Sequence, residues 1–244
     1  MSTNAIPLFP VELLENIISE AWSSPLTADE RITLMTASLL VNKTWSAVFT
    51  RVSSKDVHIP CESYAEQLFR VLREESPIYD EQTRSLPDRL CHSLTFKIHA
   101  DPLKGSTPIQ LFGLNHRMAE TMGNTLYAIH TIGYFPNLRR VCIEYVDWGY
   151  EDIIDHYRLI AFPEQVTEFE LKFSFSKNIP QSTVDTLRAN YVRHDCLPWH
   201  MSSIRCLTIL GAGADFVTDI AKTCNNSKML ITDVYFDHFP PESR

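Results

Sequence analysis

The feature that most constrains this fold is one spacing of apolar residues that recurs in five segments of the chain. In each segment, two apolar residues follow a first one at intervals of three and two positions. Alternation of this kind indicates a β-strand with one buried face. The segments are Cys91-x-x-Leu94-x-Phe96, Leu138-x-x-Val141-x-Ile143, Val166-x-x-Phe169-x-Leu171, Ile204-x-x-Leu207-x-Ile209 and Ile231-x-x-Val234-x-Phe236.

The stretches between these strands mostly have helical patterns. Ser63-x-x-Glu66 has the form of a capping box that opens a helix through "YAEQLFRVLREE", and "STVDTLRANYVRH" has the spacing of another helix. Strands that alternate with helices favour a parallel sheet with helical crossovers. The sequence therefore predicts an α/β fold.

The recurring spacing is also the L-x-x-L-x-L core of a leucine-rich repeat, whose apolar positions face inward. The middle positions, 94, 141, 169, 207 and 234, are separated by 47, 28, 38 and 27 residues. Two of these intervals fit a repeat of about 20–29 residues, and two are longer. An irregular repeat array and an ordinary parallel sheet both remain open, and Pro136-Asn137-Leu138 at the start of one strand favours the array.

The first 55 residues have helical patterns only. Pro10 stands at the favoured first position of one helix, Thr27-x-x-Glu30 is a capping box for a second, and Asn42 is a cap for a third. We therefore predict a helical domain over residues 1–55 and an α/β domain over residues 56–244.

The charge and the cysteines limit the possible partners and the compartment. The net charge of −8 argues against nucleic acid, because binding to phosphates needs a basic face. No apolar run reaches the roughly 20 residues of a membrane span, and the N-terminus lacks the pattern of a signal peptide. The six cysteines form no C-x-x-C pair, so reduced thiols are expected. These features predict an intracellular protein, cytoplasmic or nuclear, that does not bind membranes.

Two stretches near the N-terminus, "LFPVELLENII" and "SLLVNKTWSAVF", resemble an F-box. That motif opens with Leu-Pro-x-Glu-Leu/Ile, continues with an isoleucine pair and closes with Val-Cys-Lys-x-Trp. The chain departs from it at Phe9, at Asn42 and in a longer stretch between the two halves. The corresponding segments are Phe9-Pro10-Val11-Glu12-Leu13-Leu14, Ile17-Ile18 and Val41-Asn42-Lys43-x-Trp45.

The rest of the chain is similar to the irregular leucine-rich-repeat-like region of fungal F-box proteins. The resemblance implies three helices that dock on the Skp-family adaptor of a cullin–RING ubiquitin ligase (an SCF complex), while the second domain binds a protein substrate. Other subunits would catalyse ubiquitin transfer. We therefore expect this chain to have no enzymatic activity, cofactor or metal of its own.

The first helix has more apolar residues than one buried stripe requires, because Leu13 and Ile17 lie beside the stripe of Leu14 and Ile18. A unit of about 50 residues buries a small fraction of its surface, so one stripe should stay exposed and form an interface. Trp45 could serve the interface or the core. Alternatively, the helix packs wholly on the strand domain as a cap. The residues expected to contact the adaptor are Leu8, Pro10, Leu13, Leu14, Ile17, Ile18, Val41 and Trp45.

The outward positions of the strands would form one polar surface of mixed charge. A solvated sheet face would look the same, but this surface is our candidate for contact with a protein substrate. The candidate residues are Lys97, Arg140, Glu144, Glu168, Glu170, Lys172, Asp233 and Tyr235.

Three alternatives concern other chemistry or another role. Gly211-x-Gly213 lies between a strand and a helix, as in a phosphate-binding turn, but a third glycine and a lysine are missing. His194, Cys196 and His200 lack the second ligand pair of a zinc site. A phosphate-binding α/β enzyme is thus one alternative, and an interaction scaffold outside any ligase is another.

Overall fold

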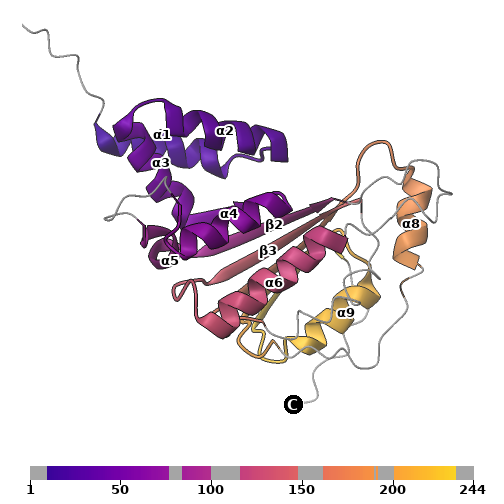
Figure 1. Ribbon diagram of the computed structural model, residues 1–244. Helices are drawn as coiled ribbons and strands as arrows, with labels where there is room; N and C mark the ends of the chain where they lie inside the picture. The colour runs from indigo at the N-terminus through magenta and orange to yellow at the C-terminus, as the bar shows by residue number, and fades with distance from the viewer. Residues whose placement is uncertain are drawn as a thin grey trace, which may run out of the picture.

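The computed structural model describes residues 10–76, 84–99, 116–147, 162–189, 191 and 201–234. The three helices predicted near the N-terminus are present and pack together (Figure 1). They are α1 (Val11–Ser23), α2 (Ala28–Leu40) and α3 (Lys43–Lys55). We call them the helical unit.

Local hydrogen bonds explain where these helices begin. Thr27 and Glu30 form the predicted capping box at the start of α2. The Asn42 side chain accepts a hydrogen bond from the Trp45 backbone N–H and so caps α3. Pro10 precedes α1 instead of being its first residue, and its carbonyl accepts the first backbone hydrogen bonds of the helix.

A parallel sheet of six strands follows the helical unit, so the α/β class is confirmed. Its strands lie in the order in which they occur in the chain, and within the described residues each pairs only with its sequence neighbours. The strands are β1 (Asp56–Ile59), β2 (Ser93–His99), β3 (Arg140–Val146), β4 (Glu168–Ser174), β5 (Cys206–Leu210) and β6 (Met229–Thr232).

Helices cover one face of this sheet, which we call the inner face. In Figure 1, α4, α6 and α9 lie next to one another along it. A sequential strand order produces this arrangement, because right-handed crossovers that always advance in one direction place their helices on one side. The described helices outside the helical unit are α4 (Glu62–Leu72), α5 (Leu86–Leu90), α6 (His116–Ile132), α8 (Gln181–Ala189) and α9 (Ala214–Thr223).

The predicted spacing correctly locates the inner face of four strands. Leu94, Val141, Phe169 and Leu207 are aligned across β2 to β5. These residues, and the other apolar positions of their four segments, are at most 1% exposed. The fifth segment is wrong, because Leu230 instead of Val234 aligns with Leu207. Thr232 takes the next inner position, opposite Ile209, and Phe236 lies outside the described residues.

A second correction concerns the start of α4. The predicted Ser63–Glu66 capping box is absent, because α4 begins at Glu62 and Cys61 is its N-cap. Ser63 lies inside the first turn, where its hydroxyl is 3.3 Å from the Cys61 sulfur. Ser63 therefore lies too far into the helix to cap it.

Two separate hydrophobic clusters hold the molecule together. The larger one joins the inner face of the sheet to α4, α6 and α9. The smaller one lies inside the helical unit, with Ile18, Trp22, Val48, Phe49 and Val52 at its centre. Among the described residues, no helix has both the length and the apolar character needed to cross a membrane.

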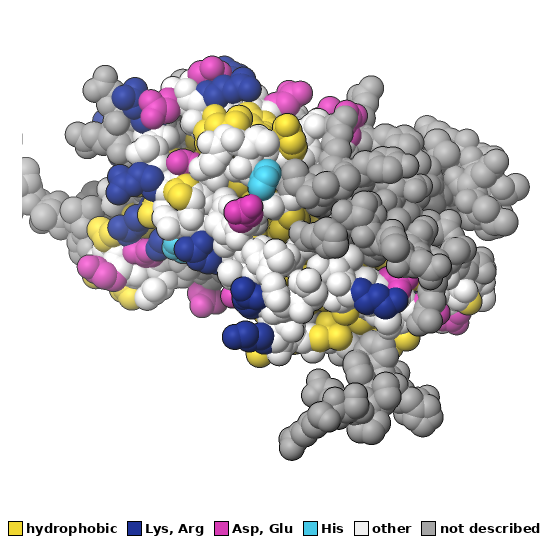
Figure 2. Space-filling model, turned by 90° about the horizontal axis from the view of Figure 1, so that it is seen from below, with side chains coloured by type: hydrophobic (Ala, Val, Ile, Leu, Met, Phe, Trp, Pro, Cys, Tyr) yellow, Lys and Arg dark blue, Asp and Glu magenta, His cyan; other side chains and the backbone are white. Residues whose placement is uncertain are grey.

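From below, the molecule shows its hydrophobic side chains in small groups, with charged and other polar side chains between them (Figure 2). Scattered apolar side chains are normal on a protein surface.

Candidate functional site

The outer face of the sheet, opposite the inner face, carries polar side chains in three aligned rows. His58, Thr95, Cys142 and Glu170 form the middle row across β1 to β4. The flanking rows are Asp56, Ser93, Arg140 and Glu168 on one side, and Lys97, Glu144 and Lys172 on the other. The register thus brings together six of the eight residues predicted to contact a substrate.

The charged residues of these rows form ion pairs. Glu170 accepts hydrogen bonds from Arg140 and from Lys172, whose Nζ lies 2.8 Å from Glu170 Oε1. Although burial alone would raise the pKa of Glu170, these hydrogen bonds lower it. The Lys97 Nζ and Glu144 Oε2 are 3.9 Å apart, so that pair is loose.

The other two predicted substrate-contact residues do not join the rows. Asp233 follows β6, and both oxygens of its carboxylate accept a hydrogen bond from the Gly211 backbone N–H, at 3.0 and 2.9 Å. Asp233 therefore closes the turn after β5. Tyr235 lies outside the described residues.

Part of the outer face is covered, although no crossover helix among the described residues lies on it. Ser93, Thr95 and Cys142 point outward but are buried. The end of α1, the loop between α1 and α2, and Arg31 of α2 line the space above them. They enclose a pocket of about 410 Å³, which we call the outer-face pocket. Its volume is within the range of small-molecule sites.

Trp22, near the end of α1, fixes the helical unit against the sheet. Its Nε1 donates a hydrogen bond to the Asp56 carbonyl at 2.8 Å, and its ring meets the His58 ring edge-on at 5.3 Å. The Phe49 ring packs on it in the same way at 5.5 Å. Trp22 is therefore shared between the core of the helical unit and the first strand.

Arg31 is a buried cation at the edge of the pocket. Its Nη1 and Nη2 donate to the carbonyls of Trp22 and Ser24, at 2.8 and 3.1 Å. Its guanidinium carbon lies 4.8 Å from the centre of the Trp22 ring. Within the described ranges no carboxylate forms an ion pair with Arg31. Burial therefore lowers its pKa, and Glu144 offsets this effect only in part.

The pKa of the His58 imidazole depends on its burial and on the charges around it. Burial and the nearby cations Arg31, Arg140 and Lys97 lower the pKa of His58 to about 3. The ring is therefore neutral at physiological pH. Burial is the largest cause of this shift, and the three cations add to it.

The residues predicted to contact an adaptor have different environments. Leu13 and Ile17 are about half exposed on α1, and Val41, which follows α2, is also exposed. Leu14 is partly buried, Pro10 is exposed, and Leu8 lies outside the described residues. Ile18 is buried in the core of the helical unit, so in this structure its side chain has almost no surface for the expected contact.

Trp45 belongs mainly to the core. It is partly buried and packs against the small cluster of the helical unit. Its Nε1 is buried without a hydrogen-bond partner among the residues described. The exposed apolar surface of the helical unit therefore consists of aliphatic side chains, and Leu40, the last residue of α2, is the most exposed of them.

The glycine turn after β5 has a structural role that the sequence left open. Gly211 has φ +78°, and a Cβ atom there would lie 2.2 Å from the Phe173 carbonyl oxygen. Its carbonyl accepts a hydrogen bond from Arg188, and its N–H donates to the Asp233 carboxylate. A protein carboxylate thus binds the N–H that a phosphate would need.

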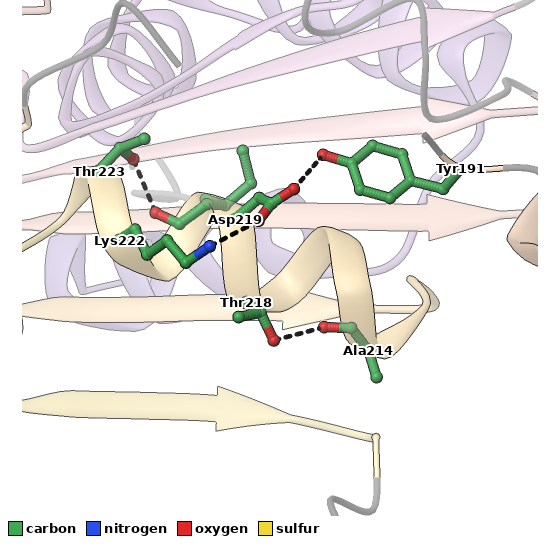
Figure 3. Close-up of polar contacts among 7 residues, drawn as sticks. Tyr191, Ala214, Thr218, Asp219, Lys222 and Thr223 are labelled. Atoms are coloured by element: carbon green, nitrogen blue, oxygen red, sulfur yellow. Dashed lines mark hydrogen bonds and ion pairs between the residues drawn. The ribbon is translucent and has the colours of Figure 1, made fainter. Parts of the chain in front are cut away.

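A polar cluster on α9 also has a structural role. Asp219 is buried and accepts hydrogen bonds from the Tyr191 hydroxyl and from Lys222 Nζ, both at 3.1 Å (Figure 3). The same view shows Thr218 and Thr223 bonded to backbone carbonyls of α9. The cluster ties residue 191 to the helix.

The remaining reactive groups are buried or lie elsewhere. Burial raises the pKa of the Cys142 thiol to about 12 and that of Cys224 to about 11, which disfavours the reactive thiolate. In the described segments no group of three or more His, Cys, Asp or Glu side chains could hold a metal ion. His194, Cys196 and His200 fall outside those segments.

The outer-face pocket was not predicted from the sequence. Arg31 and the stretch 22–28 look like ordinary parts of a helical hairpin, and only the folded chain brings them to β1, β2 and β3. A tryptophan and an arginine that flank a short polar loop were the only local signal.

Known proteins give no guide to the function, because no family model, curated protein or solved structure matches this chain.

Proposed function

We propose that this chain is a substrate-recognition adaptor of an SCF-type cullin–RING ubiquitin ligase. The helical unit acts as an F-box and binds a Skp-family subunit. The sheet and its helices form an irregular leucine-rich-repeat-like array that presents a protein substrate. Ubiquitin transfer is catalysed by other subunits.

One observation carries this proposal: the helical unit exposes aliphatic side chains while having its own core. Leu13 is 47% exposed, Ile17 49%, Val41 55% and Leu40 80%. Leu13 and Ile17 are four residues apart on α1 and share one face. An exposed apolar helix face, such as that of Leu13 and Ile17, often marks a binding interface.

The motif resemblance and these positions support each other. Leu13, Ile17 and Val41 belong to the segments that resemble an F-box, and all three are exposed, whereas their neighbour Ile18 fills the core. A face of about 800 Å² on each partner is sufficient for a stable complex. The adaptor would therefore contact Leu13, Ile17, Leu40 and Val41 and leave the core of the helical unit intact.

The sequential strand order supports the repeat-like interpretation of the second domain. In such an array each unit contacts only its neighbours, and its outward strand residues form a continuous surface. The rows from β1 to β4 provide that surface, and Lys97, Arg140, Glu144, Glu168, Glu170 and Lys172 remain the proposed contacts to a substrate.

A binding assay with the purified Skp-family adaptor of the host tests this proposal. We expect the wild-type protein to bind and Leu13→Asp to bind at least about tenfold more weakly, because the variant buries an unpaired charge in the interface. Ile132→Asp is the matched control, since Ile132 is an exposed aliphatic residue on α6, outside the helical unit.

Folding must be checked for each variant by circular dichroism and thermal unfolding. Leu13→Asp and Ile132→Asp should both remain folded, since both side chains are exposed. Absence of wild-type binding would refute the adaptor function and favour an interaction scaffold. Equal loss of binding in the two variants would show that Leu13 has no specific part in the contact.

A further inference from the structure

We propose that the outer-face pocket binds a phosphate or carboxylate group, held by Lys97, Arg140, Lys172 and Arg31. This inference does not depend on the adaptor function. It follows from three observations: the enclosure of the pocket, its incompletely neutralised positive charge, and the donors that line it.

The enclosure comes from two parts of the chain that are far apart in sequence. Residues 22–28 and Arg31 form one side of the pocket, and the outer faces of β1 to β4 form the other. Ser93, Thr95 and Cys142 are buried beneath it, whereas the Lys97, Arg140 and Lys172 side chains are 26%, 40% and 36% exposed, so a group inside is partly shielded from bulk water. Charge interactions there are stronger than on an open surface.

Four cations line the pocket, and the carboxylates Asp56 and Glu144 line it with them, so its positive charge is largely but not fully neutralised once Glu170 is counted. Glu170 pairs with both Arg140 and Lys172 and so neutralises one of their two charges. Glu144 lies 3.9 Å from Lys97, too far for a good hydrogen bond.

Arg31 adds a cation without an ion-pair partner in the described part of the chain. Buried charges are normally paired, and an anion in the pocket would supply the missing partner.

The lining offers donors suited to an oxyanion. Lys97 and Lys172 lie in one row on either side of Glu144, and Arg140 lies on the strand between them. Ser93 and Thr95 provide hydroxyl groups in the adjacent rows. Charge-assisted hydrogen bonds from such groups to phosphate or carboxylate oxygens are short and strong.

Burial is the main cause of the low pKa of His58, and the cations of the pocket lower this pKa further. Arg31, Arg140 and Lys97 all act against protonation of the imidazole. The opposing acidic groups on the outer face are Asp56, Glu144, Glu168 and Glu170. An anion bound among the three cations would therefore raise the pKa of His58.

Titration calorimetry on the full chain with inorganic phosphate, and separately with citrate, tests the proposal. Sodium chloride keeps the ionic strength constant, because screening alone would alter weak charge interactions. We expect saturable binding at one site, and a higher melting temperature at saturation, since a ligand of the folded state stabilises it.

The variants locate the site. Lys97→Gln and Lys172→Gln should each weaken the binding about tenfold, because each removes a charge-assisted hydrogen bond. Lys228→Gln is the control: it removes an exposed lysine outside the pocket and should leave the affinity unchanged. Arg31→Gln is less informative, because Arg31 also holds two backbone carbonyls.

Nuclear magnetic resonance of labelled histidines gives an independent readout. With His58→Gln used to assign the signal, phosphate should raise the pKa of His58. The proposal is overturned if neither anion binds at about 10 mM, where a site of millimolar affinity would be largely filled. It is also overturned if binding persists unchanged in both lysine variants.

The anionic group could arrive as a free small molecule or on the side chain of a bound polypeptide. A blocked tripeptide with a central phosphoserine distinguishes these sources. Binding of the peptide about tenfold tighter than phosphate identifies a polypeptide source. Equal affinities identify a free small molecule.

Discussion

Gly211 has a backbone conformation and a close neighbour that exclude any side chain. Its φ is +78°, and a Cβ atom would lie 2.2 Å from the Phe173 carbonyl oxygen. Gly211→Ala should therefore lower the free energy of unfolding by about 3 kcal/mol or more, through left-handed strain and steric overlap. Urea denaturation measures this loss.

Two other glycines separate the effect of left-handed strain on stability from the effect of steric overlap. Gly133 has φ +81°, but a Cβ atom added there would have no atom within 4 Å. Gly133→Ala should therefore lower the free energy of unfolding by only about 1–2 kcal/mol, because left-handed strain is the sole effect. Gly213 has a negative φ and ordinary contacts, and its replacement by Ala should cost less still. Equal losses at Gly211 and Gly133 would contradict the steric argument.

His58 should make the stability depend on pH. Its pKa is about 3 in the folded protein, compared with 6.5 for a free histidine, so the unfolded chain binds more protons between these values. The free energy of unfolding should therefore fall as the pH is lowered from about 7 toward 5, by up to about 1.4 kcal/mol per pH unit from this group.

Urea titrations at pH 7 and pH 5 test this dependence. His58→Gln should show a smaller loss of stability between the two pH values than the wild type. His130→Gln, a change at an exposed position on α6, should behave like the wild type. If His58→Gln retains the whole loss, other groups cause it.

At the scale of elements, a side-chain cap stabilises the start of α2, and its contribution can be measured by comparing two similar residues. Thr27 caps α2 with its hydroxyl, whereas Ser63 lies inside the first turn of α4. Thr27→Ala should lower the free energy of unfolding by about 1 kcal/mol, and Ser63→Ala should change it by much less. Chemical denaturation of both variants checks this, and comparable losses would show that capping is not the cause.

The strands show what the sequence could and could not predict. Leu94, Val141, Phe169 and Leu207 were identified correctly, because burial on one face imposes alternation and the register follows from it. The last strand was placed four residues too late. Its inner position opposite Ile209 is Thr232, which does not look like a core residue, and the long-range bond between Asp233 and Gly211 closes the strand.

For the whole molecule, the sequential strand order predicts a gradient of local stability. β2, β3 and β4 each have seven residues and a paired neighbour on both sides, whereas β6 has only four residues and one neighbour in the described sheet. Hydrogen exchange should therefore be slower in β2, β3 and β4 than in β6. Mass spectrometry of peptic fragments can measure this, and uniform protection of the strands would contradict it.

The candidate site could be predicted only in part, because it depends on how the two clusters meet. Period and alternation place Lys97, Arg140 and Lys172 on one face. The spacing of apolar residues does not predict that the Trp22 side chain donates a hydrogen bond to the Asp56 carbonyl. It also does not predict that Arg31 lies over that face. Such contacts depend on geometry between elements, and local sequence does not encode it.

The pairing of each strand only with its sequence neighbours also has a consequence for evolution. Duplication or loss of one strand–helix unit would change only the strand pairs on either side of that unit and would leave the other strand pairs unchanged. A chain built this way can therefore vary in length, and with it the span of its outer face, while its N-terminal helices keep their own contacts.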